Sequence, residues 1–300
     1  MTKKLITLLL ALTMVFACAV PVVAVSNNSS GTYTQTTIPT VDGTFSVKLN
    51  IQGYGIDDGT TTYNPIQQFN LDVDMGSADA IDASYTVEDV LNAAAIQYAD
   101  ILAFNIITDD DHGQYLYGVK DINADMWFVP KAVKNGTKTY FCGWMFRING
   151  QMPMLNSTDG ASIDEAYVGE NYVVDVFYAN PYDINYSTAF TQVIYDTITS
   201  SGAKRFQVLY SNCYYANNNT TFTVTNFAPA AYQSIQVIVD GTTLNVTTNS
   251  NGKFALSGLS SGTHTMKVVF DVYNTFTDAM DSTVYYDIPE VLNTYNTFTF

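Results

Sequence analysis

Histidine, cysteine and basic residues are scarce in this 300-residue sequence, which contains 2 His, 3 Cys and 12 Lys plus Arg. A structural zinc site takes about four Cys, His or carboxylate ligands, whereas His112 and His264 stand far apart along the chain. A nucleophile needs a base within hydrogen-bond reach, and neither His belongs to a motif that supplies one. The sequence therefore predicts no metal site and no catalytic residue.

The net charge is −16, because the 12 basic residues face 28 acidic ones. A charge of this sign repels nucleic acid and anionic lipid over the range at which Coulomb steering acts. The hydrophobic content of 47% beside 13% charged residues provides enough apolar area for real cores. These values predict a folded acidic protein and exclude nucleic acid as its partner.

The N-terminal residues resemble an export signal. Lys3 and Lys4 precede an uncharged run over residues 5–25, and small residues end it at Ala24, as at a signal-peptidase site. We expect residues 1–24 to be a signal peptide and residues 25–43 a linker. The protein would then be secreted, extracellular or on the cell surface, with no membrane span in the mature chain. A transmembrane segment and lipoprotein processing at Cys18 are the alternatives.

Removal of the signal peptide leaves two thiols, those of Cys142 and Cys213. An oxidising compartment permits one disulfide between them. Cys142 lies in an apolar run and Cys213 in an aromatic one, so two buried free thiols that pack as small hydrophobic groups are the other interpretation.

The pattern of residues 44–180 predicts an α+β domain, with one helix against a mostly antiparallel sheet. Apolar and polar residues alternate over residues 44–51 and 67–75, which predicts two paired strands with a loop at residues 53–62. Thr86 is the expected N-cap of a helix that ends near Tyr98. Further strands are expected over residues 101–108, 114–120, 140–148 and 172–178, with Asn149 and Gly150 forming a tight turn.

The region of residues 181–300 contains short apolar runs separated by Asn, Gly and Ser turns. This spacing predicts an all-β immunoglobulin-like sandwich. The expected strands cover residues 203–210, 220–227, 234–239, 253–256, 264–272 and 283–286. Residues 188–199 are the one candidate helix.

Three segments, residues 86–94 (TVEDVLNAA), 143–151 (GWMFRINGQ) and 168–176 (VGENYVVDV), occur in this order. In order and spacing they resemble a bacterial and archaeal domain family related to the C-terminal domain of transcobalamin. The resemblance covers residues 44–180 and implies a β-grasp-like domain. It also implies a corrinoid, such as cobalamin, as the ligand. A β-domain alone encloses only half of a large macrocycle.

Four residues are the candidate ligand contacts: Trp144, Asn149, Tyr115 and Tyr117. Trp144 lies close to the turn at Asn149, where an indole ring is able to form an aromatic platform for a sugar or for the edge of a corrinoid. Tyr115 and Tyr117 alternate on a neighbouring strand. A half-buried position in the core is the favoured alternative for Trp144, and cross-strand packing explains the tyrosines as well. The acidic turn from Asp109 to Asp111 is either a weak calcium site or a solvated loop.

The sequence thus favours a secreted or cell-surface, non-catalytic binding protein. A small molecule such as a corrinoid is the ligand that the family resemblance implies. The abundance of aromatic residues, with 22 Tyr, favours a surface glycan or a protein as the partner of an adhesin. A structural stalk module of a surface array is the alternative of a different kind.

Overall fold

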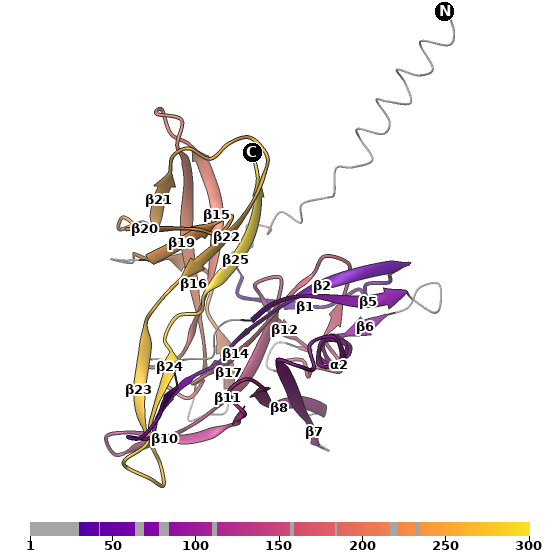
Figure 1. Ribbon diagram of the computed structural model, residues 1–300, viewed down its shortest axis with the longest axis vertical. Coiled ribbons are helices and arrows are strands. Elements are labelled where there is room, and N and C mark those ends of the chain that lie inside the picture. Colours follow the sequence, from indigo (N-terminus) through magenta and orange to yellow (C-terminus); the bar gives the residue numbers. More distant parts are fainter. Residues whose placement is uncertain are drawn as a thin grey trace, which may run out of the picture.

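The computed structural model describes residues 30–41, 43–63, 69–77, 84–109, 113–156, 159–183, 185–216, 221–231 and 235–300. The expected signal peptide, residues 25–29 and 42 of the expected linker, and residues 110–112 of the acidic turn lie outside these ranges. The described part of the expected linker contains strand β1 (Thr32–Thr34), which pairs with β12 (Met152–Met154). The described chain is mostly β-strand, with a single helix (Figure 1). This confirms a β-rich fold.

The helix is α2 (Val87–Gln97). The strands of the first half are β1 (Thr32–Thr34), β2 (Thr44–Gln52), β3 (Gly55–Asp57), β4 (Thr62–Tyr63), β5 (Phe69–Ser77), β6 (Tyr85–Thr86), β7 (Leu102–Asp109), β8 (Gly113–Asp121), β9 (Met126–Phe128), β10 (Lys131–Asn135), β11 (Lys138–Ile148), β12 (Met152–Met154), β13 (Tyr167–Val168) and β14 (Val173–Ala179).

The strands of the second half are β15 (Ala189–Ile198), β16 (Lys204–Ala216), β17 (Thr221–Val224), β18 (Ala228–Pro229), β19 (Ile235–Val239), β20 (Thr242–Val246), β21 (Lys253–Leu256), β22 (Thr263–Val269), β23 (Tyr273–Asp278), β24 (Tyr285–Pro289) and β25 (Thr294–Thr299).

A nine-stranded sheet joins the two halves of the sequence. Its order is β4-β3-β24-β23-β10-β11-β14-β2-β5, so β23 and β24 sit between strands of the first half. Val133 of β10 pairs with Asp278, and Gly55 of β3 pairs with Asp287. The predicted domains, residues 44–180 and 181–300, therefore share one hydrogen-bonded sheet, whose C-terminal strands run toward the lower left in Figure 1.

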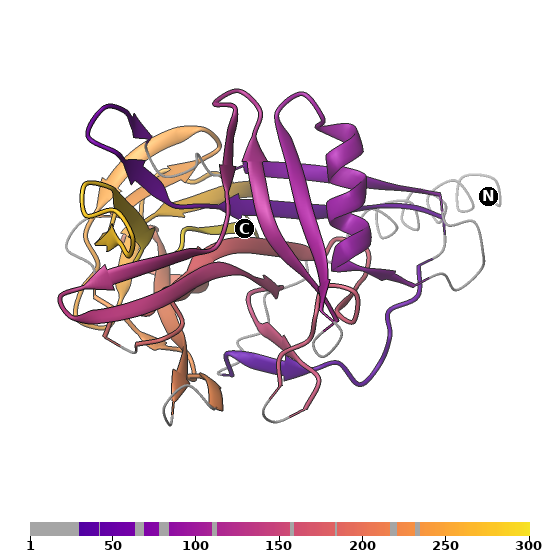
Figure 2. The same cartoon turned by 90° about the horizontal axis from the view of Figure 1, so that it is seen from below.

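Helix α2 begins and ends where the sequence predicts. The Thr86 hydroxyl accepts a hydrogen bond from the backbone N–H of Asp89, and the Asp89 carboxylate accepts one from the backbone N–H of Thr86. This reciprocal arrangement is a capping box. Val87, Val90, Leu91 and Ala94 are buried, as expected for one apolar stripe. Figures 1 and 2 show the helix alongside β2 and β5.

The two faces of β2 have different surroundings. Phe45, Val47, Leu49 and Ile51 are buried in the same core as the apolar stripe of α2. Asn50 on the opposite face is buried too. Side chains alternate along a strand, so this sheet packs the helix on one face and carries buried polar groups on the other.

The second half contributes two further sheets, one of order β15-β16-β17 and one of order β20-β19-β22-β25. Phe206 of β16 and Val237 of β19 are fully buried in one core, to which both sheets contribute. Strand β16 then enters another core: its buried residues change from Phe206 and Val208 to Ser211 and Cys213. The buried side of β16 thus switches along its length.

Two sequence predictions are wrong. Residues 188–199 form strand β15, not a helix, because their Thr, Val, Ile and Tyr side chains pack on a pleated sheet and pair with β16. Residues 53–62, expected to be a loop, contain β3, which extends the nine-stranded sheet by pairing with β24. That pairing joins residues more than 200 positions apart, so no local sequence pattern predicts it.

Cys142 and Cys213 are buried free thiols, as in the second of the two interpretations. Burial raises the pKa of the Cys213 thiol to about 12 and raises that of Cys142 as well. In the described part of the chain no helix is long and apolar enough to cross a membrane.

Candidate functional site

Trp144 lies half-buried between two cores. Its indole Nε1 donates a hydrogen bond of 2.8 Å to the carbonyl oxygen of Phe128. Its ring meets the ring of Tyr178 edge-on, with the centroids 5.5 Å apart. These contacts satisfy the polar and apolar parts of the indole within the fold, as expected for a packed tryptophan.

Asn149 occupies the turn after β11 with a backbone φ of 51°, in the left-handed region that Asn tolerates better than most residues. Its side-chain oxygen accepts a hydrogen bond of 2.9 Å from the backbone N–H of Val173. Asn149 therefore fixes the turn against the start of β14, as the predicted tight turn requires.

Tyr115 and Tyr117 lie on β8, in a three-stranded sheet of order β7-β8-β9. Tyr115 is exposed and Tyr117 is half-buried. Within the described ranges, no hydrogen bond or ring contact joins these tyrosines to Trp144 or Asn149. Ligand contact by any of the four candidate residues stays a prediction.

The face of the nine-stranded sheet opposite α2 carries a buried ion pair. Arg147 of β11 is 1% exposed, and its Nε lies 2.6 Å from Oδ2 of Asp175 on β14. The Asp175 Oδ1 atom accepts a hydrogen bond from Asn50. An Arg147 Nη1 donates to the carbonyl oxygen of Thr191 at 3.0 Å, and its guanidinium lies over the ring of Phe190. This cluster ties β11 and β14 to β15.

The cavity beside this pair has a volume of only about 10 Å³, which is about the room that one water molecule needs. Asn293, near the C-terminus, also reaches this face through a hydrogen bond from its backbone N–H to Gln52. The buried pair is therefore a structural junction between the two halves of the sequence and not a ligand pocket.

A row of aromatic rings leads from one exposed ring to three half-buried rings between the two halves. Phe141 of β11 is 63% exposed, and its ring centroid lies 6.4 Å from that of Tyr182. Tyr182 stacks on Tyr215 of β16 at 5.2 Å, and Tyr215 lies 5.3 Å from Phe222 of β17. We call these four residues the aromatic row. The exposed ring of Phe141 at the end of the row is able to contact an apolar group or the apolar face of a sugar.

Backbone pairing fixes the aromatic row in place. The backbone N–H of Tyr215 donates to the carbonyl oxygen of Pro181 at 2.6 Å, and Tyr215 pairs with Phe222 across β16 and β17. Burial, followed by the nearby Tyr182 hydroxyl, raises the pKa of Tyr215. The row is thus built on strands and one short connection, which gives its rings fixed positions.

The described residues contain no group of three or more His, Cys, Asp or Glu side chains that would hold a metal ion. His264 on β22 has a single acidic partner: its Nδ1 lies 2.6 Å from Oδ2 of Asp240, and its Nε2 lies 3.2 Å from the carbonyl oxygen of Ser260. The resulting His–Asp pair links β22 to the turn before β20.

The His264–Asp240 pair predicts a pH dependence of stability. The hydrogen bond with Asp240 raises the pKa of His264 above its ordinary 6.5, and the bond with His264 lowers that of Asp240 below 3.8. The stabilising effect is therefore complete between about pH 3.8 and 6.5. It is lost as pH rises through the folded pKa of His264 and as pH falls through that of Asp240.

We expect H264N to be less stable than the natural chain at pH 6 and nearly equal to it at pH 9. Urea unfolding at both pH values measures this difference. In a D240N background the same His264 substitution should show a much smaller pH dependence, and an unchanged dependence would contradict the assignment.

No family model matches the sequence, and comparison with curated proteins and with solved structures gave no match. The resemblance to the transcobalamin-related family accordingly stays a prediction.

Sequence reasoning missed the aromatic row. Its members come from four segments spread over about 80 residues. The Tyr-rich run around Cys213 is the one sequence signal that indicates part of the row. Spacing along the chain does not reveal that β11, β16 and β17 bring these rings into one line.

Proposed function

We propose that this chain is a secreted, non-catalytic binding protein that holds a polysaccharide of a surface or matrix, and that the aromatic row is its contact surface. One observation carries the proposal: three consecutive ring contacts join the four rings of the aromatic row and lead to Phe141, which is 63% exposed. Exposed aromatic rings on rigid strands bind the apolar faces of sugars at little cost in side-chain entropy.

Two features of the sequence and the fold support this proposal. The expected export signal and the excess of acidic residues suit an extracellular protein. Helix α2 against the sheet of β2 and β5 supports a β-grasp-like arrangement for residues 44–180, and the core shared by Phe206 and Val237 supports an immunoglobulin-like sandwich in the second half.

The proposal predicts that F141A and Y182A weaken binding to polysaccharide at least ten-fold, since aromatic anchors commonly contribute 1.4 kcal/mol or more, or about a factor of ten. Affinity electrophoresis of the mature chain through gels that contain soluble β-glucan, mannan or pectin measures this effect. Y285A, which removes another exposed tyrosine outside the row, is the matched control and should leave migration unchanged.

A cobalamin titration followed by absorbance tests the ligand that the family resemblance implies. The aromatic-row proposal expects no spectral change at high micromolar cobalamin. Tight cobalamin binding that F141A leaves intact, together with equal migration of all variants in every gel, would overturn the proposal in favour of corrinoid capture. Y115A distinguishes the residues predicted from sequence, because it should affect binding only if β8 contacts the ligand.

A further inference from the structure

A hollow lies on the second half of the molecule, where β16 and β21 pair. It has a volume of about 470 Å³ and opens to solvent. Arg205 and Lys253 line it together with Thr247, Thr248 and Asn249. This volume lies in the usual range for small-ligand sites and matches one or two sugar units.

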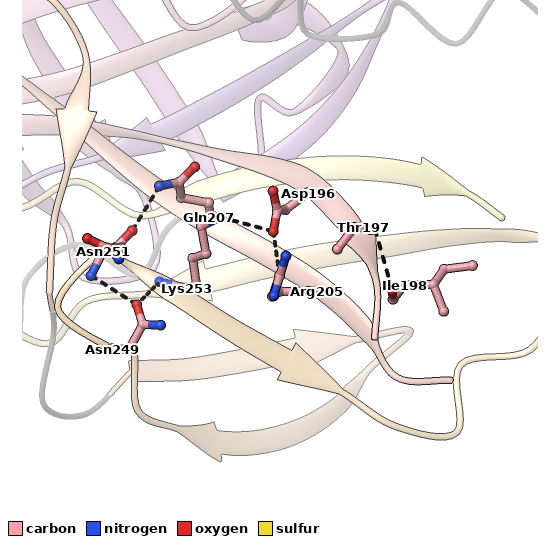
Figure 3. A network of polar contacts seen from close by, with 8 residues as sticks. All are labelled: Asp196, Thr197, Ile198, Arg205, Gln207, Asn249, Asn251 and Lys253. Atoms are coloured by element: carbon pink, nitrogen blue, oxygen red, sulfur yellow. Dashed lines mark hydrogen bonds and ion pairs between the residues drawn. The ribbon is translucent and has the colours of Figure 1, made fainter. Parts of the chain in front are cut away.

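Positive charge is in excess over negative charge among the ion-paired side chains at the hollow. Oδ2 of Asp196 accepts a hydrogen bond from Arg205 Nε and lies 3.2 Å from Lys253 Nζ (Figure 3). Two cations therefore share one carboxylate, and one positive charge is left in excess. Partial burial acts to raise the pKa of Asp196, but the bonds from Arg205 and Lys253 outweigh it and hold the pKa below 3.8. Both cations keep further N–H donors beyond the one that each directs at Asp196.

A β-bulge positions the shared carboxylate. Tyr195 pairs with Phe206 and Thr197 with Arg205, so Asp196 is the extra residue of β15. A bulge redirects a side chain from its regular alternation and is common next to binding sites. Here it turns Asp196 toward the two cations.

The wall of the hollow is rigid. The Asn249 side-chain oxygen accepts hydrogen bonds from the backbone N–H groups of Asn251 and Lys253, and Gln207 donates to the carbonyl oxygen of Asn251. Gly252 has a φ of 71°, and a Cβ there would lie 2.5 Å from the carbonyl oxygen of Val208. The turn therefore has one close-packed conformation, which holds Lys253 at the hollow before any ligand arrives.

We propose that this hollow binds an oxyanion of the ligand, a carboxylate or a sulfate ester, so that the polysaccharide of the proposed function is an acidic one. Arg205 and Lys253 hold the anion, and Thr247, Thr248 and Asn249 border the sugar. The identification of the anion as part of a polysaccharide rests on the proposed function. The anion site itself does not, because binding of a small anion tests the hollow alone.

The first test compares polygalacturonate, dextran sulfate and neutral dextran by isothermal titration calorimetry with the mature chain. R205Q and K253Q should each bind the acidic polymers about ten-fold more weakly than the natural chain does, which is the typical loss for a charge-assisted hydrogen bond. Their affinity for neutral dextran should equal that of the natural chain. K48Q is the matched control, since it removes an exposed lysine that also pairs with an aspartate. A preference for one acidic polymer identifies carboxylate or sulfate as the group.

D196N provides the second test, because it removes the competing carboxylate and leaves both cations. Binding of the acidic polymers should become several-fold tighter, a result that a purely structural ion pair would not give. Unchanged or weaker binding by folded D196N would overturn the proposal.

The failures are distinguishable. Acidic and neutral polymers that bind equally, with a loss only in F141A, would overturn the oxyanion site and leave the aromatic row. If no polymer binds but free galacturonate or sulfate binds the natural chain and not R205Q, the oxyanion site stands and the polysaccharide proposal fails. Absence of binding in both experiments overturns both.

Discussion

Replacing Arg147 with methionine is expected to lower the free energy of unfolding by about 3–5 kcal/mol, the cost of leaving one partner of a buried ion pair without its counter-charge. Arg147 is 1% exposed and is the bonded cation of Asp175. It also donates to the carbonyl oxygen of Thr191. The substitution therefore leaves the Asp175 carboxylate without its counter-charge on the face of the sheet that meets β15. Equilibrium unfolding in urea measures the loss.

Two variants make this prediction specific. K48M removes an exposed lysine that pairs with the exposed Asp72, and it should cost at most about 1 kcal/mol because water screens that pair. R147M/D175L removes both buried charges and should be more stable than R147M alone. If R147M costs no more than K48M, the buried pair does not hold the two halves together.

Replacing Phe206 with alanine is expected to lower the free energy of unfolding by about 3–5 kcal/mol through loss of apolar contacts and the cavity that remains. The Phe206 ring is fully buried. It contacts the rings of Tyr195, Phe254, Phe298 and Phe300, so the cavity is surrounded by side chains from β15, β21 and the C-terminal segment that have limited freedom to close it.

F141A is the matched control for this prediction, because the same atoms are removed from a side chain that is 63% exposed. Its effect should stay within about 0.5 kcal/mol. A small loss in F206A would mean that the core of the second half is loosely packed.

Both destabilising substitutions also test how the two halves cooperate. Strands β23 and β24 belong to the sheet that contains β10 and β3, and Arg147 reaches Thr191 across the junction. We therefore expect a single transition in denaturant, with R147M and F206A shifting the whole of it. Two separate transitions would indicate that residues 44–180 and 181–300 unfold as independent domains.

The local elements could be predicted because their determinants are local. Thr86, Asp89 and the buried stripe of α2 lie within one short segment, and the alternation in β2 follows directly from a strand with one face on the core. The turn at Asn149 was equally clear, because few residues other than Asn and Gly tolerate a positive φ. Strand β15 was missed because its alternation is weak: its first five residues are all buried.

The candidate sites could not be predicted in the same way. The residue type of Trp144 and its nearness to a turn suggest a ligand contact, but in the fold its Nε1 donates a hydrogen bond to the carbonyl oxygen of Phe128. Arg205 and Lys253 are 48 residues apart, and only the register of β16 with β21 brings them to one carboxylate.

The sequence by itself determined the acidic balance of the chain, the helix at Thr86 and about half of the strands, because charge, capping and alternation depend on composition or on near neighbours. The tertiary structure alone decided which strands lie side by side. It placed β23 and β24 within the sheet of the first half, buried Arg147 against Asp175, and aligned Phe141 with Tyr182. Such pairings depend on hydrogen bonds and packing between distant segments, which no local pattern encodes.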